Sequence, residues 1–131
     1  MIIPPGFNTV APYFFVRDAE RFVAFLVDGL GGIETVRSLR PDGRIANVQV
    51  RLGTSTVMVS EASEQFPAMA AAHYLYVEDA DAAMKRCLEH GATLEMPVGD
   101  MPYDERQGGV RDPGGNIWWI SQRLVEGPYL P

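Results

Sequence analysis

Few side chains in this chain are of the types that do nucleophilic or acid–base chemistry. Cys87 is the single cysteine, and His73 and His90 are the two histidines. Cys87 falls on the apolar stripe of a predicted helix, where a cysteine is a small core residue rather than a nucleophile. His90 falls in the last turn of that helix, where a cation complements the carbonyl end. His73 falls on a predicted strand at a position that faces the helices, so we expect a structural histidine.

The carboxylates best placed to reach a cleft are Glu61, Asp104 and Glu105, which lie at a strand end or in a predicted loop. Without matched metal ligands, such side chains are more often solvated loop charges than acid–base catalysts. Arg106 and Arg111 either bind an anionic group or pair with Asp104, Glu105 and Asp112. The sequence contains no nucleophile triad, phosphate-cradling glycine loop or paired-cysteine motif. Whether any reaction is catalysed therefore stays open.

Two segments repeat each other at a constant offset of 61 residues. Residues 11–19 read APYFFVRDA and residues 72–80 read AHYLYVEDA, and they align without a gap. Each copy opens with an apolar, aromatic run typical of a strand, followed by an aspartate that can cap a helix. The chain is therefore expected to contain two copies of one module.

The spacing of apolar and turn residues predicts the elements of each module. Helices are predicted near 19–30, ending at Gly31-Gly32, and near 80–90, ending at Gly91. Strands are predicted near residues 10 and 71, where the repeat begins, and at 33–39, 44–52, 55–60, 93–96, 108–111 and 117–122. Residues 62–71 and 97–107 are predicted to be loops, and 126–131 a tail.

The element order is β-α-β-β-β, present twice, which predicts an α+β fold. We expect a single domain over residues 1–131, with module one at about 8–61 and module two at about 70–123. The two modules are expected to form one curved mixed sheet around one concave cleft.

Composition excludes several classes of partner. The chain has 131 residues, of which 47% are hydrophobic and 21% charged, as in an ordinary globular domain. Its apolar runs are shorter than a membrane span and its first residues lack a signal pattern, so we expect a cytoplasmic protein with no membrane association. The formal charge is −6, with 10 acidic and 5 basic residues in 66–131. This field repels nucleic acid and favours cationic small molecules.

The duplicated pattern resembles the vicinal oxygen chelate superfamily, which includes glyoxalase I, extradiol dioxygenases, fosfomycin-resistance enzymes and metal-free bleomycin-binding proteins. The resemblance rests on the two strand-Asp-Ala-helix openings and on the late turn VRDPGGN at 110–116, and it covers about residues 8–123. Residues 101–113, MPYDERQGGVRDP, resemble uncharacterised glyoxalase/bleomycin-resistance-like proteins. The resemblance implies a fold and leaves the function open.

In the superfamily's metalloenzymes, four residues on the concave face hold a metal. One lies near the start of each module's first strand and one on each module's last strand. The resemblance places these positions at Ala11, Ala72, Trp119 and about Met58. None offers the oxygen or imidazole nitrogen that divalent cations bind. We therefore expect no metal and no other cofactor.

Strand alternation assigns side chains to the concave face or to the helix side. In the strand 44–52, it assigns Ala46, Val48, Val50 and Leu52 to the helix side. The predicted ligand-binding residues on the concave face are Tyr13, Phe15, Asn47, Gln49, Arg51, Tyr74, Tyr76 and Trp119. Such an aromatic wall with a polar strip suits planar or amphipathic organic ligands. Alternatively, these aromatic side chains fill the cleft themselves.

Three functions are compatible with these patterns. The first is a metal-free homodimer that binds a small hydrophobic or aromatic compound, as bleomycin-resistance-type proteins do. The second is a metal-dependent lyase or dioxygenase with unusual ligands such as His73 and Glu61. The third is a structural or partner-binding protein with a filled cleft. We expect the first.

Overall fold

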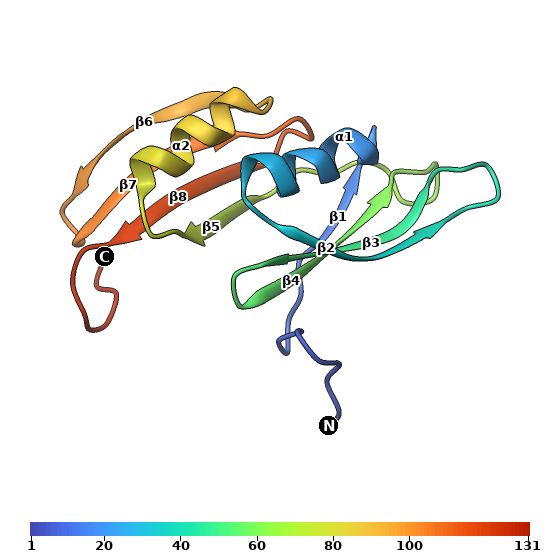
Figure 1. Ribbon diagram of the computed structural model, residues 1–131, viewed down its shortest axis with the longest axis horizontal. Helices are drawn as coiled ribbons and strands as arrows, with labels where there is room; N and C mark the ends of the chain where they lie inside the picture. The colour runs from blue at the N-terminus through green and yellow to red at the C-terminus, as the bar shows by residue number, and fades with distance from the viewer.

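The computed structural model describes all 131 residues and shows the duplicated module in an α+β arrangement (Figure 1). Module one consists of β1 (Tyr13–Val16), α1 (Ala19–Ala24), a π-helical turn η1 (Phe25–Gly29), β2 (Ile33–Leu39), β3 (Ile45–Leu52) and β4 (Ser55–Glu61). Module two consists of β5 (Ala72–Tyr76), α2 (Ala80–Glu89), β6 (Thr93–Met101), β7 (Glu105–Arg111) and β8 (Ile117–Arg123). The predicted fold class and element order are confirmed.

Each module has its own four-stranded mixed sheet, with the orders β1-β4-β3-β2 and β5-β8-β7-β6. The first strand runs parallel to the last, and Tyr13 lies opposite Met58 as Tyr74 lies opposite Trp119. The register therefore repeats at the offset seen in the sequence. No backbone ladder joins the modules, so two sheets lie side by side where one continuous sheet was expected, and both helices cover the same side (Figure 1).

Both helices begin at the predicted aspartates. The Asp18 side chain accepts a hydrogen bond from the Arg21 N–H at 3.3 Å, and the Asp79 side chain accepts one from the Ala82 N–H at 3.0 Å. A side chain that accepts from the first turn satisfies a donor with no partner inside the helix. Neither α1, with 6 residues, nor α2, with 10, is long enough to cross a membrane.

The core lies between the helices and the sheets and is continuous across the two modules. Its largest buried apolar side chains include Phe14, Phe22, Phe25, Leu26, Val48, Val59, Trp118 and Ile120. Cys87 is buried among them, as predicted, and burial raises the pKa of its thiol to about 11. The Phe14 ring of module one lies 4.7 Å from the His73 ring of module two. The modules are therefore joined through the helix layer.

Two sequence predictions about strands are wrong, and local irregularities explain both. Residues 97–107 are mostly strand rather than loop, because β6 extends through Met101 and β7 begins at Glu105. Register shifts in β6 accommodate Pro97 and Gly99 on an edge strand. A further shift leaves Ala46 unpaired in β3, so Ala46 leaves the helix side and Ile45 becomes buried instead.

Candidate functional site

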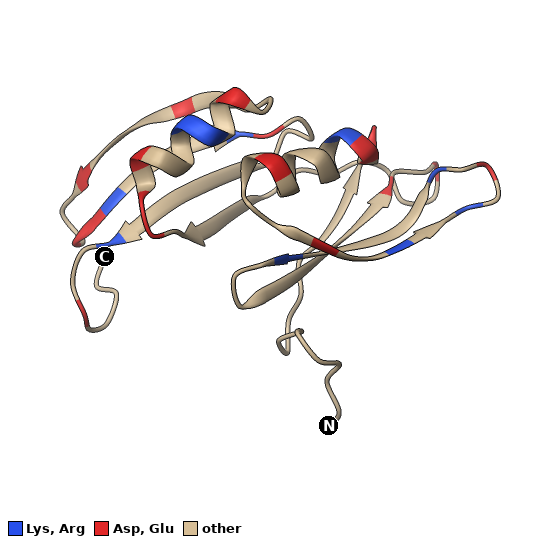
Figure 2. Cartoon of the chain, in the orientation of Figure 1, with Lys and Arg blue, Asp and Glu red and all other residues tan.

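The face of the sheets opposite the helices, here called the concave face, carries a row of partly exposed aromatic rings. Alternation separates this face from the core: Tyr13 is 43% exposed, whereas Phe14 is 4% exposed. Trp118 is 3% exposed on the helix side, and its neighbour Trp119 is half-buried on the concave face. The first and last strands of each module, β1, β4, β5 and β8, carry few charged residues (Figure 2). The exposures of Tyr13, Phe14 and Trp118 agree with the predicted orientation of β1 and β8, whereas that of Ala46 in β3 was wrong.

The module-one hollow has a volume of about 370 Å³ and an aromatic wall. It is lined by Tyr13, Phe15, Arg40, Ala46, Ser60, Glu61 and Phe66. The rings of Tyr13 and Phe15 are 4.8 Å apart, and Phe15 stacks on Phe66 at 5.7 Å. The hydroxyls of Tyr13 and Ser60 are hydrogen-bonded at 2.7 Å. Stacked rings beside a polar end are suited to a planar ligand with one polar group.

Of the predicted polar strip, Asn47, Gln49 and Arg51, only the first two residues belong to this site. The Asn47 Nδ2 lies 3.4 Å from the Tyr13 hydroxyl, and the Gln49 Nε2 donates to Asn47 Oδ1 at 3.4 Å. Arg51 is exposed, and its Nε donates to the Gly53 carbonyl at 3.1 Å. Asn47 and Gln49 therefore join Tyr13, whereas Arg51 turns to its own hairpin. The strip satisfies its own hydrogen bonds and does not by itself require a ligand.

The module-two hollow has a volume of about 330 Å³ and is lined by Tyr74, Tyr76 and Tyr129. The hydroxyls of Tyr74 and Tyr76 both donate to the carboxylate of Glu105, in the second case at 2.8 Å. Arg123 Nη1 lies 3.4 Å from the same carboxylate. Glu105 is completely buried, which corrects its prediction as a solvated loop charge. The reason is that β7 begins at this residue and directs it under the tyrosines.

The C-terminal segment folds back over module two, where a free tail was predicted. Arg123 Nη2 donates to the Pro128 carbonyl at 2.7 Å. The segment places the Tyr129 ring edge-on to the Tyr74 ring, with 6.0 Å between the ring centres. The centre of the Tyr103 ring lies 5.5 Å from that of Tyr129. Sequence reasoning missed these residues because their positions depend on contacts outside any strand or helix pattern. Only the aromatic character of the segment was a signal.

Trp119 lies on the concave face of β8, between β5 and β7, and packs over a glycine. A Cβ atom at Gly109 would lie 2.6 Å from the Trp119 ring. Gly109 is also the residue opposite Trp119 in the pairing of β7 with β8. Since a side chain at 109 would displace the indole, this glycine is what allows the ring to lie against the sheet. Trp119 thereby adjoins Tyr74, its partner on β5.

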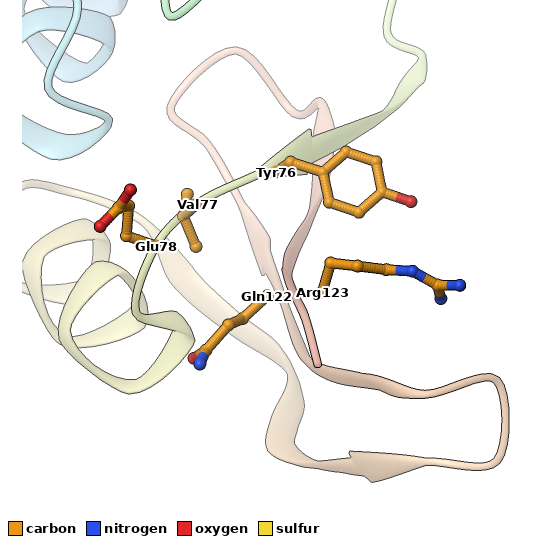
Figure 3. A pocket seen from close by; sticks show the side chains of 5 residues that line it. All are labelled: Tyr76, Val77, Glu78, Gln122 and Arg123. Carbon is orange, nitrogen blue, oxygen red and sulfur yellow. The ribbon is translucent and has the colours of Figure 1, made fainter. Parts of the chain in front are cut away.

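A third, more polar hollow of about 580 Å³ lies beside module two at the start of α2. Figure 3 shows its lining of Tyr76, Val77, Glu78, Gln122 and Arg123. Tyr76 and Arg123 point the same way, and Glu78 and Gln122 lie on the other side (Figure 3). The Gln122 Oε1 accepts the first N–H of α2, from Ala80, at 3.0 Å. This hollow is therefore built around a helix cap.

Glu61 repeats this capping role in module one, 61 residues before Gln122. Its two carboxylate oxygens accept hydrogen bonds from the N–H groups of Asp18 and Ala19, both at 3.0 Å. A carboxylate at a helix N-terminus also complements the helix dipole. Glu61 is thus engaged in fixing the start of α1, although it borders the module-one hollow.

His73 lies on the helix side, as its position in the strand predicted. Its ring packs 4.8 Å from that of Trp118, and its Nε2 has no hydrogen-bond partner. Burial lowers the pKa of His73, which favours the neutral imidazole. Because the Glu61 carboxylate is held by the N–H groups of Asp18 and Ala19, whereas the His73 ring packs on Trp118, these two residues do not converge on a common ion.

The residues present do not fit the superfamily's metal centre. Met58 and Trp119 occupy equivalent positions in the two sheets, and Ala11 and Ala72 offer only methyl groups. No three His, Cys, Asp or Glu side chains gather closely enough to hold a metal ion. A divalent cation would therefore lack oxygen and imidazole ligands at these positions.

The two arginines considered as anion sites are paired with carboxylates, although not with the predicted ones. Arg106 Nε donates to Asp81 at 2.7 Å and its Nη1 to Asp100 at 3.0 Å. Arg111 pairs with Glu95 at 3.2 Å. These pairs lie at the surface and contribute little to stability. They place neither arginine in the aromatic hollows.

Comparison with known proteins agrees with this architecture. Uncharacterised proteins of Mycobacterium bovis (Mb0911c) and Mycobacterium tuberculosis H37Rv (Rv0887c) are 28% identical over 131 residues, covering 89% of this chain and 84% and 75% of theirs. The structure of TioX from Micromonospora sp. ML1 has a TM-score of 0.76 at 25% identity, covering 90% of this chain and 99% of TioX. A glyoxalase-related enzyme from Fulvimarina pelagi has the same fold, with a TM-score of 0.69 at 20% identity and coverage of 95% and 98%. The model of the Glyoxalase/Bleomycin resistance protein/Dioxygenase superfamily matches residues 6–120, and the chain belongs to that superfamily.

Proposed function

We propose that this protein binds a small hydrophobic or aromatic compound on its concave face, without a metal and as a homodimer. The observation that carries the proposal is the set of aromatic rings left partly open to solvent in both hollows. Tyr13 and Tyr74 are each 43% exposed and Phe66 is 52% exposed. Exposed apolar rings gathered in a hollow mark a binding surface, since a stacked ligand would remove them from water.

The hollows argue against a concave face filled by its own side chains. The open volume beside the aromatic walls is about 370 Å³ in module one and about 330 Å³ in module two. Drug-sized ligands occupy pockets of roughly 300–1,000 Å³. Capture by stacking does not need a metal ion, which is consistent with the alanine, methionine and tryptophan side chains at the superfamily's metal positions.

Exposed apolar side chains on an edge strand support the homodimer. Ile33, Val36 and Leu39 of β2 are all more than 45% exposed, and β2 is an edge of its sheet. Edge strands of this kind are usually covered by another element or chain. Light scattering on the purified protein is expected to give twice the 14.4 kDa chain mass. A mass equal to one chain would refute this part of the proposal.

Binding is tested with a single-tryptophan protein. In the Trp118→Phe variant, Trp119 is the one remaining indole, and its fluorescence should be quenched saturably by 2-naphthol, carbazole or flavone in chelator-treated protein. Calorimetry should show that Trp119→Ala weakens the same compounds by about 1–3 kcal/mol, the usual cost of losing a stacked anchor. Trp119 does not line either hollow itself but adjoins Tyr74 of the module-two hollow. The matched control is Arg51→Ala, on the same face, where the side chain bonds its own hairpin; this change should leave the affinity unchanged. No saturable binding by any planar compound would refute the proposal.

A further inference from the structure

We propose that the module-two hollow is a cage for an organic cation, which binds an alkylammonium or quaternary ammonium group. This inference rests on the proposed function, because it names the chemical class that one end of the bound compound should have. Three tyrosines make up the entire lining of the hollow: Tyr74, Tyr76 and Tyr129. None of the hollow's lining side chains is aliphatic or charged.

The three rings surround the hollow from different directions. The Tyr74 and Tyr76 centroids are 5.4 Å apart with an angle of 49° between the rings. Tyr129 meets Tyr74 edge-on, at 6.0 Å and 86°. The face of an aromatic ring is negative, and a cation within about 6 Å of a ring centre is attracted to it. Rings at such angles present more than one face to a single tetrahedral head group.

The buried carboxylate under the cage strengthens this attraction. Tyr74 and Tyr76 both donate their hydroxyl protons to Glu105, and a phenol that shares its proton with a carboxylate is polarised toward a more negative ring. Burial and the neighbouring carboxylate raise the pKa of both phenols, so the tyrosines remain neutral and keep donating. Glu105 therefore acts on the ligand through the rings.

The nearby positive charge of Arg123 is already matched. Its guanidinium lies against Glu105 at 3.4 Å and donates to the carbonyls of Tyr103 and Pro128 at 2.8 and 2.7 Å. With this pair included, residues 66–131 carry 10 acidic and 5 basic side chains, and this negative balance attracts cations at long range. The module-one hollow differs, because Arg40 lines it and its carboxylate, Glu61, is bound to the first N–H groups of α1 rather than to the aromatic side chains.

The test compares two compounds of the same shape, choline and 3,3-dimethylbutan-1-ol, which differ by a charged nitrogen in place of a neutral carbon. Both are titrated by proton NMR, in which the tyrosine rings should shift the methyl signals upfield. We expect choline to bind roughly 3- to 30-fold more tightly, the range that cation–π attraction gives. Tyr129→Leu should remove this preference, and Tyr13→Leu, the matched change in module one, should preserve it. Tyr129 is 43% exposed and lies outside both sheets, so its variant is expected to fold.

Three outcomes would overturn the inference. They are equal affinities for the two compounds, a preference that survives Tyr129→Leu, and no saturable choline binding up to about 100 mM. If neutral planar compounds still quench Trp119 in any of these cases, the proposed function stands and only the cation cage is wrong. If they also fail to bind, both proposals are wrong.

Discussion

Replacing each of the adjacent tryptophans by alanine should have opposite effects on stability and binding. Trp118 is 3% exposed, stacks on Phe14 at 5.8 Å and donates from Nε1 to Asp112 Oδ2 at 2.7 Å. Trp118→Ala removes a fully packed ring, which costs about 3–5 kcal/mol. It also leaves the buried Asp112 carboxylate with one donor fewer, which costs roughly a further 1 kcal/mol or more. The total of about 4–6 kcal/mol corresponds to a fall in Tm of about 12–25 °C for a domain of this size.

Trp119→Ala removes a half-buried ring that lies over Gly109. We expect this variant to lose only about 1–2 kcal/mol, because the ring is partly exposed and its removal leaves no enclosed cavity. Thermal and urea denaturation followed by circular dichroism measure both variants. If Trp118→Ala is unfolded at 25 °C, Trp118→Phe replaces it in the comparison, with an expected loss of about 1–2 kcal/mol in the free energy of unfolding. Equal destabilisation by the two alanine variants would show that the assignment of the two faces, and with it the candidate site, is wrong.

Four smaller predictions follow from individual contacts. Glu61→Ala should cost about 1–2 kcal/mol in urea denaturation, because it removes the cap of α1, and Glu61→Gln should lose less. Cys87 should not react with Ellman's reagent at pH 8 in the native state and should react at once in denaturant, since burial raises its pKa to about 11. Because burial lowers the pKa of His73 below 6.5, its contribution to stability is complete above pH 6.5 and is lost at lower pH; the decline in the free energy of unfolding from pH 7 to 5 should be smaller in His73→Phe. Gly109→Ala should shift the fluorescence of Trp119 and weaken planar ligands, and an unchanged affinity would mean that the position of the indole over the glycine does not matter.

The repeat and the strand alternation predicted most of the fold because both are local patterns. Tyr13 and Tyr74 occupy equivalent positions opposite their last strands, as the offset requires. Alternation failed at Ala46, where a bulge in β3 inserts one residue and moves it into the module-one hollow. A bulge is set by pairing with the neighbouring strand, and single-strand periodicity carries no information about it.

The module-two site could not be predicted because it is assembled from distant segments. Glu105 was assigned to a loop, and its burial depends on hydroxyls contributed by β5, 29 and 31 residues earlier in the chain. Tyr129 reaches the hollow through contacts of Arg123 with the C-terminal backbone. The periodicity of apolar residues in the sequence indicates neither contact, because each depends on tertiary packing rather than on the strand pattern.

The most direct test of the account is to map binding on the chelator-treated protein by 1H–13C NMR of the aromatic side chains during a titration with 2-naphthol. The account predicts saturable shift changes at concave-face residues such as Tyr13, Tyr74 and Trp119, with none of comparable size at Phe14 and Trp118 on the helix side. Binding that appears only after a divalent metal is added would contradict the central claim. So would saturable changes confined to the helix side.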